Sequence, residues 1–485
     1  MAEKPPYPLG DMDVDLFRQQ ARRLADWIAK YLEDSETYPV LSRVKPGDIR
    51  AALPARPPDR PEPFSDIFED FDRILMPGIT HWNHPSFFGY FAISGSGPGV
   101  LAEFLSAGLN VQAMLWRTSP AATELEEVAL SWLRQLIGLP DSFEGVIYDT
   151  ASVSTLHALA AARQVAVPEV RERGLAGRSE VGGLRVYCSD QAHSAADKSV
   201  ILLGLGQGAL RKIGVNERFE MRADLLRAAI AEDRRAGLTP VAVVATVGTT
   251  STTSVDPVDQ IAEICAAENL WLHVDAAYAG VAAMLPEHRH ILRGAERADS
   301  FVVNPHKWLF TPFDLSAFYC RRMDVVRRVF SVVPEFLRTP EERQARNLMD
   351  TGIQLGRRFR ALKLWMILRY FGADGIRGRL AEHIRLAHLF AAWVDAHPDF
   401  ERLAPVPLSV VCFRAKPAAR TWTDAELDSL NERLLENVNA SGQVFLSHTR
   451  INDRFALRLA VGHIRTTEVH VKKAWDLLVQ LLRDC

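Results

Sequence analysis

The chain has 485 residues, of which 48% are hydrophobic and 24% are charged, and its 57 Lys and Arg against 60 Asp and Glu give a formal net charge of −3. This composition is typical of a globular protein with enough apolar side chains for two or three cores, and it excludes a disordered or collagen-like chain. Because positive charge is not in excess, the composition predicts that neither nucleic acid nor a membrane is a partner.

The cysteines indicate the compartment. They are odd in number and far apart in the sequence, with no CxxC pair: Cys188, Cys265, Cys320, Cys412 and Cys485. Such spacing is typical of free thiols in a reducing environment. No segment has the apolar length of a signal peptide or of a membrane span. We therefore expect a cytoplasmic protein.

The first 85 residues resemble an arm. Apolar side chains recur at three- and four-residue steps over residues 13–31, which predicts an amphipathic helix. Residues 53–63 contain five prolines and should run extended over a surface. Residues 1–85 are too few to enclose this apolar face in a core of their own, so we expect the arm to pack on a partner subunit.

Six short β-rich runs alternate with helical stretches between residues 145 and 320: residues 146–148, 184–188, 241–247, 271–274, 301–303 and 317–319. Residues 241–247 are almost continuously apolar, as in strands that are buried on both faces. This pattern predicts a large α/β domain over residues 86–365, with a mainly parallel sheet and helices on both faces. Ligands of such sheets bind at the carboxyl ends of the strands.

The C-terminal part of the sequence no longer shows the alternation of strands and helices. Two helices are predicted over residues 357–370 and 379–397, followed by a strand at 408–413 and a hairpin turn at Asn452 and Asp453. Two more helices are expected to begin at Thr423 and Thr467, one on each side of the hairpin. These elements predict a small α+β domain over residues 366–485.

Two polar residues follow neighbouring predicted strands. Lys307 comes shortly after the strand at 301–303, and Asp275 ends the strand at 271–274. If both lie in one crevice, the lysine suits Schiff-base chemistry and the acid would keep a pyridine nitrogen protonated. The simpler interpretations are a surface lysine and a helix-capping aspartate.

Two weaker clusters also follow strands. Residues 149–152 precede a helical run, where backbone N–H groups and the helix dipole favour a phosphate. His193 lies beyond the strand at 184–188, where its ring is able to stack on a flat cofactor. Neither cluster is specific by itself, because helix caps and loop histidines are common.

Taken together, six motifs in order over almost the whole chain resemble the pyridoxal-phosphate-dependent aromatic L-amino-acid decarboxylases, the group II decarboxylases. The motifs are Ile79–Trp82, Ser189–Ser194, Ala245–Thr250, His273–Tyr278, Asn304–Trp308 and Leu355–Lys363. The resemblance implies pyridoxal 5′-phosphate as cofactor and the aspartate aminotransferase-like fold (fold type I). It also implies a homodimer with active sites at the subunit interface, and no metal.

The resemblance further implies roles for single residues. Lys307 would hold the cofactor as a Schiff base, Asp275 would pair with the pyridine nitrogen, and Ala277 and His193 would contact the two ring faces. Thr246 would lie near the ring substituents. The phosphate would bind Thr150, Ala151, Ser152, Asn304 and His306. The substrate side chain would lie among Trp82, Phe91, Ile93, Gln112 and Met114, the last two coming from the partner subunit.

The chain departs from the family at one position. Counting back from Leu355 places the family's proton-donating loop tyrosine at Leu348, which we count with the substrate pocket and which has no proton to donate. Either His193 or a water supplies the proton, or the loop register differs, or oxygen reacts and an aldehyde forms, as in aromatic aldehyde synthases. The charged segment 332–351 is expected to form a closing lid.

The expected reaction is decarboxylation of an aromatic L-amino acid, of the tryptophan, tyrosine, phenylalanine or DOPA type, to the arylalkylamine and CO2. A remote alternative is an NAD-dependent oxidoreductase, because residues 204–209 fit GxGxxA and Asp224 follows about twenty residues later. That interpretation leaves Lys307 and Asp275 without roles.

Overall fold

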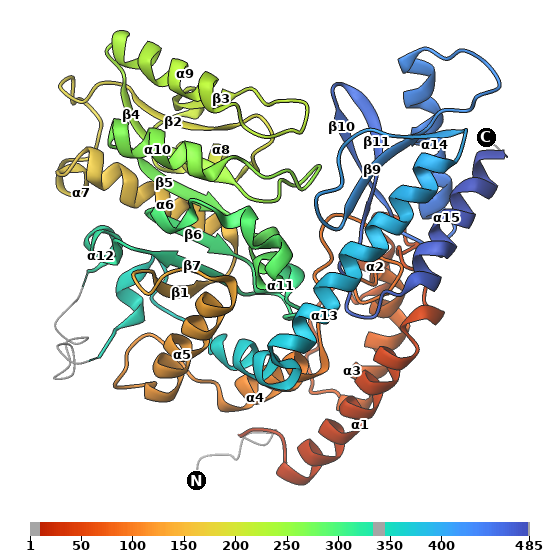
Figure 1. The fold of residues 1–485 in the computed structure, drawn as a ribbon. Coiled ribbons are helices and arrows are strands. Elements are labelled where there is room, and N and C mark those ends of the chain that lie inside the picture. Colours follow the sequence, from red (N-terminus) through yellow and green to blue (C-terminus); the bar gives the residue numbers. More distant parts are fainter. Residues whose placement is uncertain (1–9, 333–344, 484–485) are drawn as a thin grey trace, which may run out of the picture.

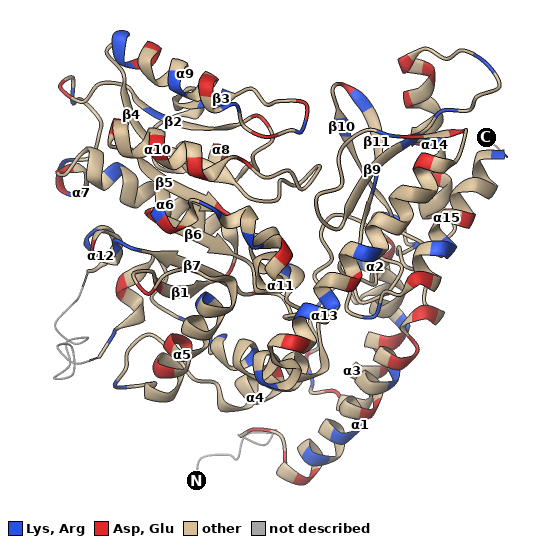
Figure 2. Ribbon diagram, viewed as in Figure 1, with Lys and Arg blue, Asp and Glu red and all other residues tan. Residues whose placement is uncertain are grey.

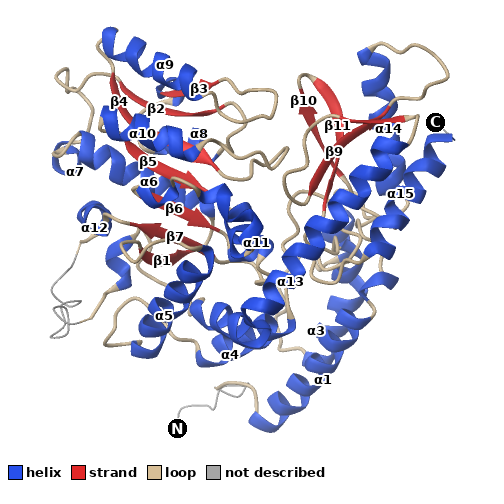
Figure 3. Ribbon diagram, viewed as in Figure 1, coloured by secondary structure: helices blue, strands red, loops and turns tan. Residues whose placement is uncertain are grey.

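The computed structural model describes residues 10–332 and 345–483. Most of the predicted lid, residues 333–344, lies outside the described residues. Two sheets organise the chain, and Figure 3 shows their strands as two separate groups with helices around them. No helix in the described ranges is long and apolar enough to cross a membrane. The boundaries at residues 85 and 365 stay a prediction.

The larger sheet has seven strands in the order β1-β7-β6-β5-β4-β2-β3 (Figure 1). Their bounds are β1 Glu144–Tyr148, β2 Leu184–Ser189, β3 Leu210–Ile213, β4 Thr239–Thr246, β5 Trp271–Asp275, β6 Ser300–Val303 and β7 Ser316–Cys320. The six predicted strands are confirmed, and β3 is an additional strand at the edge. Strand β7 runs antiparallel to both β1 and β6, whereas the other neighbours pair in parallel. The carboxyl ends of β1, β2, β4, β5 and β6 therefore share one edge.

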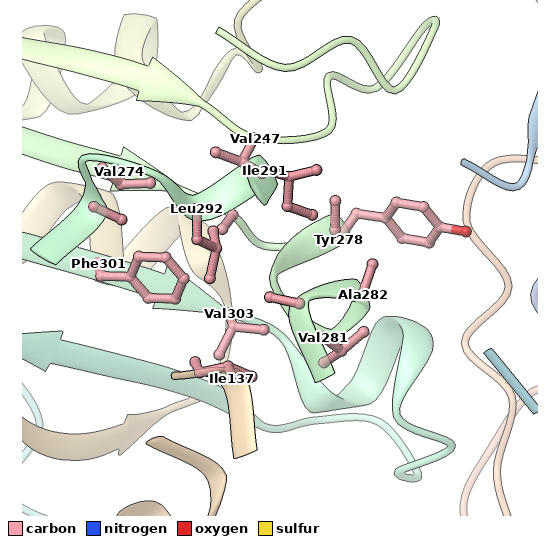
Figure 4. Close-up of a cluster of buried hydrophobic side chains, with 14 of the residues drawn as sticks. Ile137, Val247, Val274, Tyr278, Val281, Ala282, Ile291, Leu292, Phe301 and Val303 are labelled. Atoms are coloured by element: carbon pink, nitrogen blue, oxygen red, sulfur yellow. The ribbon is translucent and has the colours of Figure 1, made fainter. Parts of the chain in front are cut away.

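Helices cover both faces of this sheet, as expected. One face packs on α6 (Ala151–Ala166), α8 (Ala195–Leu202) and α12 (Met323–Phe330). The other packs on α5 (Pro120–Ile137), α9 (Ala223–Arg235) and α10 (Val258–Glu268). Alternate residues of β4 enter opposite cores, Val244 one and Val243 the other, because successive side chains of a strand point to opposite faces. Figure 4 shows part of the second core.

The smaller sheet is antiparallel, in the order β10-β11-β9-β8. Its strands are β8 Phe400–Arg402, β9 Val410–Ala415, β10 Ser447–Ile451 and β11 Arg454–Ala460. The predicted hairpin is confirmed: Asn452 and Asp453 have φ of 49° and 63°, as a two-residue turn between strands requires. Helices α14 (Asp424–Ala440) and α15 (Glu468–Arg483) begin where predicted, and Thr423 and Glu426 form a capping box at α14.

The two helices predicted over residues 357–370 and 379–397 are confirmed, but the gap between them is shorter than expected. They form the two parts of α13 (Ala361–Ala396), which meet at a kink. Its break is confined to Gly372, whose φ of 62° and ψ of 171° are not helical. Because glycine has no Cβ, it takes this conformation at one residue and the helix resumes at once.

The N-terminal segment holds α1 (Val14–Glu33), α2 (Asp48–Ala52) and α3 (Phe64–Asp70), with the proline-rich stretch between α2 and α3. The predicted amphipathic helix is thus confirmed. Within the described chain, no residue of α1 is buried, and its apolar face lines an open cavity of about 650 Å³ with α4 (Gly97–Leu109). The short helices α7 (Val170–Arg173) and α11 (Pro305–Trp308) complete the set.

Candidate active site

The pairing of the parallel strands places several predicted site residues at the carboxyl ends of neighbouring strands. Thr246, the last residue of β4, pairs with Asp275, the last residue of β5. Helix α11 follows β6 directly and carries Lys307 to the same edge. These residues line a cavity of about 180 Å³. Its lining consists of Phe91, Thr150, Ala151, Ser152, His193, Thr246, Gly248, Thr250, Asp275, Ala277, Tyr278, Asn304, His306 and Lys307.

The amine of Lys307 is set in a mostly enclosed environment. Burial lowers its pKa, Asp275 opposes this effect, and the positive charge of Arg458 adds to it. Its Nζ lies 5.3 Å from the centre of the Phe91 ring. A lysine with a lowered pKa has more of the neutral amine that attacks a carbonyl carbon.

Asp275 is 7% exposed, and one of its two carboxylate oxygens is hydrogen-bonded within the chain. Its Oδ1 accepts a hydrogen bond of 3.1 Å from the backbone N–H of Ala277, and within the described residues its Oδ2 has no hydrogen-bond donor. The geometry thus holds the side chain in place and leaves one oxygen for a ligand. An ionised carboxylate in a cavity stabilises a protonated ring nitrogen beside it.

A second group of residues offers donors for a phosphate. Helix α6 begins at Ala151 without a side-chain cap, so its first-turn N–H groups and its dipole are available to an anion. His306 lies nearby, and burial lowers its pKa to about 3. Because Nδ1 of this neutral ring accepts from the N–H of Leu315 at 2.9 Å, Nε2 carries the proton and is a donor.

His193 lines the cavity from the loop between β2 and α8. Its Nδ1 accepts from the N–H of Ala195 at 3.1 Å, which leaves Nε2 as the donor of the neutral ring. Burial lowers its pKa, and the charge of Asp275 opposes that shift. The site therefore presents a neutral, oriented imidazole that is able to stack and to donate a proton.

Of the six residues predicted for the substrate pocket, Phe91 lines the cavity. Trp82 instead packs on Phe87, with 4.4 Å between ring centres, and Ile93 is half-buried outside the described lining. Gln112 accepts from the N–H of Arg357 at 3.2 Å. Within one chain, the described lining of the cavity thus includes Phe91 but not Trp82, Ile93 or Gln112.

Met114 and Leu348 are also placed elsewhere in this chain. The carbonyl of Met114 accepts from the N–H of Met349 at 3.2 Å. Leu348 is 1% exposed and packs in the core that contains Tyr148. Within one chain, the structure therefore does not bring Leu348 to Lys307.

Four residues at or behind the cavity were not predicted: Gly248, Thr250, Tyr278 and Arg458. Gly248 has φ of 86°, and a Cβ there would lie 2.5 Å from the Cβ of Ala279, so a glycine is required. The ring of Tyr278 stacks on Phe91 at 3.7 Å, and its hydroxyl binds Ser409 (Figure 4 shows this side chain extending from the core). A charged residue in the apolar strand 455–460 was the available signal for Arg458.

Two buried polar atoms in the lining, Oγ1 of Thr246 and Oδ1 of Asn304, have no hydrogen-bond partner among the described residues. Buried polar groups are nearly always hydrogen-bonded, so these atoms indicate that a polar ligand completes the cavity. A lysine, an acid, a helix N-terminus and a stacking histidine at one sheet edge fit pyridoxal phosphate. The fold and the site together define a pyridoxal-phosphate-dependent enzyme of fold type I.

Comparison with known proteins agrees. Residues 46–416 match the model of the pyridoxal-dependent decarboxylase conserved domain. The chain is 39% identical to phenylacetaldehyde synthase of Arabidopsis thaliana, over 97% of this chain and 96% of that protein. It is also 39% identical to aromatic-L-amino-acid decarboxylase of Sus scrofa, with 96% of each covered. The crystal structure of Oryza sativa TDC with PLP and tryptamine superposes with a TM-score of 0.95 at 35% identity, over 98% of this chain and 99% of that one.

The chain therefore belongs to the pyridoxal-dependent decarboxylase family. It is a pyridoxal-phosphate-dependent amino-acid decarboxylase, and pyridoxal phosphate is its cofactor. The oxidoreductase alternative was wrong. Residues 204–209 follow helix α8 and lead into the edge strand β3, whereas a dinucleotide fold requires a strand, the glycines and then a helix.

Proposed function

We propose that the protein decarboxylates an aromatic L-amino acid, of the tryptophan, tyrosine, phenylalanine or DOPA type, to the arylalkylamine and CO2. The observation that carries the proposal is a single cavity in which Lys307 and Asp275 lie beside the aromatic rings of Phe91 and Tyr278. Among the described lining residues no arginine is present to bind an acidic side chain. The relatives named for aromatic amino acids support the same substrate class.

The cofactor supplies a conjugated ring that accepts the electrons of the broken Cα–carboxylate bond. Lys307 would hold its aldehyde carbon, and Asp275 would keep the proton on its ring nitrogen. His193 would stack on one ring face with Nε2–H toward the substrate, and Ala277 would pack on the other. Thr150, Ala151, Ser152, Asn304 and His306 would bind the phosphate. The rings of Phe91 and Tyr278 would exclude water from the reacting carbon.

The proton that ends at Cα needs a donor. Leu348 has none, and the Nε2–H of His193 or a water that it holds is our proposed source. The second candidate function is that of an aromatic aldehyde synthase, in which oxygen intervenes and hydrogen peroxide and an aldehyde form. Leu348 favours that alternative, and the similarity to a phenylacetaldehyde synthase supports it. We favour the amine because His193 is present and oriented.

Product stoichiometry tests this choice. With each of the four aromatic acids, CO2, amine, aldehyde, peroxide and oxygen uptake are measured in one reaction. We expect amine equal to CO2 and peroxide below about a tenth of it; peroxide in proportion to CO2 would establish the aldehyde route instead. If any peroxide forms, Leu348→Tyr should lower its share about tenfold or more, because a positioned acid accelerates proton transfer by ~10²–10⁴. Leu348→Phe has the same bulk without the hydroxyl and should not.

We also propose that the protein is a cytoplasmic homodimer, with active sites at the subunit interface. The support is the apolar cavity between α1 and α4, where Phe17 is 52% and Leu101 is 62% exposed. An apolar surface of this kind is typical of an interface. The described cysteines are all buried and free, as expected for a reducing compartment.

The dimer is tested by adding charge to this apolar surface. Phe17→Glu combined with Leu101→Glu is expected to give a monomer by light scattering at micromolar concentration, because the second copy would bury two unpaired carboxylates. Activity should fall with the dimer fraction, because Gln112 and Met114 are proposed to reach the partner's site. Arg18→Glu changes the charge on the exposed side of α1 and is the control. A dimeric, active double variant would contradict the proposed interface.

A further inference from the structure

Arg458 in β11 is a buried cation. It is 3% exposed, and within the described residues no carboxylate forms a salt bridge with it. Its Nη1 donates to the carbonyl of Tyr90 and its Nε donates to that of Ser251 at 3.1 Å, but its Nη2 has no partner in the described part of the chain. These two carbonyl oxygens accept hydrogen bonds from the guanidinium but carry no negative charge that would neutralise it. A buried, unpaired charge is costly, so its position at an active site indicates a function.

The guanidinium of Arg458 and the amine of Lys307 both lie close to the ring of Phe91. Its Cζ lies 4.7 Å from the centre of the Phe91 ring, and the Nζ of Lys307 lies 5.3 Å from that centre. The two cations are therefore within about 10 Å of each other. At an effective dielectric constant near 20, like charges at that separation shift a pKa by about one unit. Arg458 indeed contributes to the lowered pKa of Lys307.

The charges around Lys307 come from four elements. Asp275 of β5 is negative, and Arg458 of β11 is positive. His193, beyond β2, and His306 in α11 both have lowered pKa values and are neutral near pH 7. The guanidinium itself faces Cys412 of β9 and Tyr278, which burial keeps neutral by raising their pKa values.

Among these described groups, the carboxylate of Asp275 is thus the single negative charge beside two basic side chains, Lys307 and Arg458. Arginine does not lose its proton in proteins, so the repulsion between the two cations acts on the protonation of the lysine. Figure 2 shows that acidic and basic residues alternate along the helices around both sheets. We propose that Arg458 is a positioning residue whose charge disfavours protonation of the amine of Lys307 and so increases the nucleophilic fraction of that amine. This inference rests on the proposed function, in which Lys307 attacks the cofactor's aldehyde.

The test reads the protonation of Lys307 directly. Trace acetylation of the full-length, cofactor-free protein over a range of pH is followed by mass spectrometry of the peptide with residue 307. The pH of half-maximal reactivity should be about one unit higher in Arg458→Gln than in the unchanged protein. Arg458→Lys retains the charge and should stay close to the unchanged protein. Arg450→Gln, on the neighbouring strand β10 with an exposed side chain, should have no effect.

A second pair of variants keeps the arginine and its hydrogen bonds. Cys412 lies directly opposite Arg458 in the β9–β11 register, so Cys412→Asp would neutralise the guanidinium in place. In Cys412→Asp, the pH at which Lys307 reaches half of its maximal reactivity should rise as in Arg458→Gln. Cys412→Asn should leave that pH unchanged. An unchanged pH in both Arg458→Gln and Cys412→Asp, or an equal rise in Arg458→Lys, would overturn the proposal. Failure of the cofactor to attach to Lys307 would refute the proposed function and leave this readout intact.

Discussion

Replacing Lys307 with alanine is expected to leave a folded, colourless protein whose decarboxylase activity is lower by about 10³-fold or more. Removing a group that bonds covalently to the reacting system costs rates on this scale. The lysine lines the same cavity as Asp275, with its Nζ 5.3 Å from the centre of the Phe91 ring, and among the described lining residues no second amine is present to replace it. Visible absorption after addition of pyridoxal phosphate and initial rates of CO2 release measure the two effects.

Two further variants make this result specific. Lys307→Arg keeps a long basic side chain but has no amine for a Schiff base, so it should be as inactive as the alanine variant. Lys416→Ala removes an exposed lysine of the smaller sheet and should behave as the unchanged protein. A yellow, active Lys307→Ala protein would refute the assignment of the cofactor site.

Replacing Asp275 with asparagine should lower the rate by about 10²- to 10³-fold with little change in the folded structure. Asparagine keeps an oxygen for the N–H of Ala277 but carries no charge to hold a proton on the ring nitrogen. Loss of one preorganised electrostatic partner costs about that factor. The loss should fall on kcat more than on KM, because the charge acts on the state in which the ring accepts electrons.

The matched control is Asp299→Asn. Asp299 is also a partly buried aspartate that accepts a backbone N–H, that of Leu272, but it lies before β6 at the opposite edge of the sheet. It should change stability modestly and leave kcat unaltered. Equal losses of kcat in the two variants would mean that the effect of Asp275 is structural.

Much of the fold was predictable because its strands are buried on both faces. Residues 241–247 are almost continuously apolar, and β4 indeed lies inside the sheet. Strand β3 was not predictable, because Leu210–Ile213 holds two charged residues in four and gains its place by pairing with β2 at the edge. The single break of α13 at Gly372 depends on one backbone conformation, and tertiary packing decides whether a glycine bends a helix.

The cofactor side of the site could be predicted, because its residues follow strands that end at one edge. Lys307, Asp275 and His193 line one cavity, as their places after β6, β5 and β2 suggested. The substrate side could not, because Gln112 and Leu348 belong to segments whose positions depend on long-range packing. Arg458 was missed for the same reason: its partners Tyr90 and Ser251 are remote in sequence.

The central claim is that this cavity holds pyridoxal phosphate on Lys307. Borohydride reduction of the protein loaded with pyridoxal phosphate, followed by proteolysis and mass spectrometry, tests it most directly. We expect one pyridoxyl phosphate group per chain, on the peptide that contains residues 304–308 and attached to Lys307. A label spread over several lysines, or located on one outside this cavity, would contradict the account.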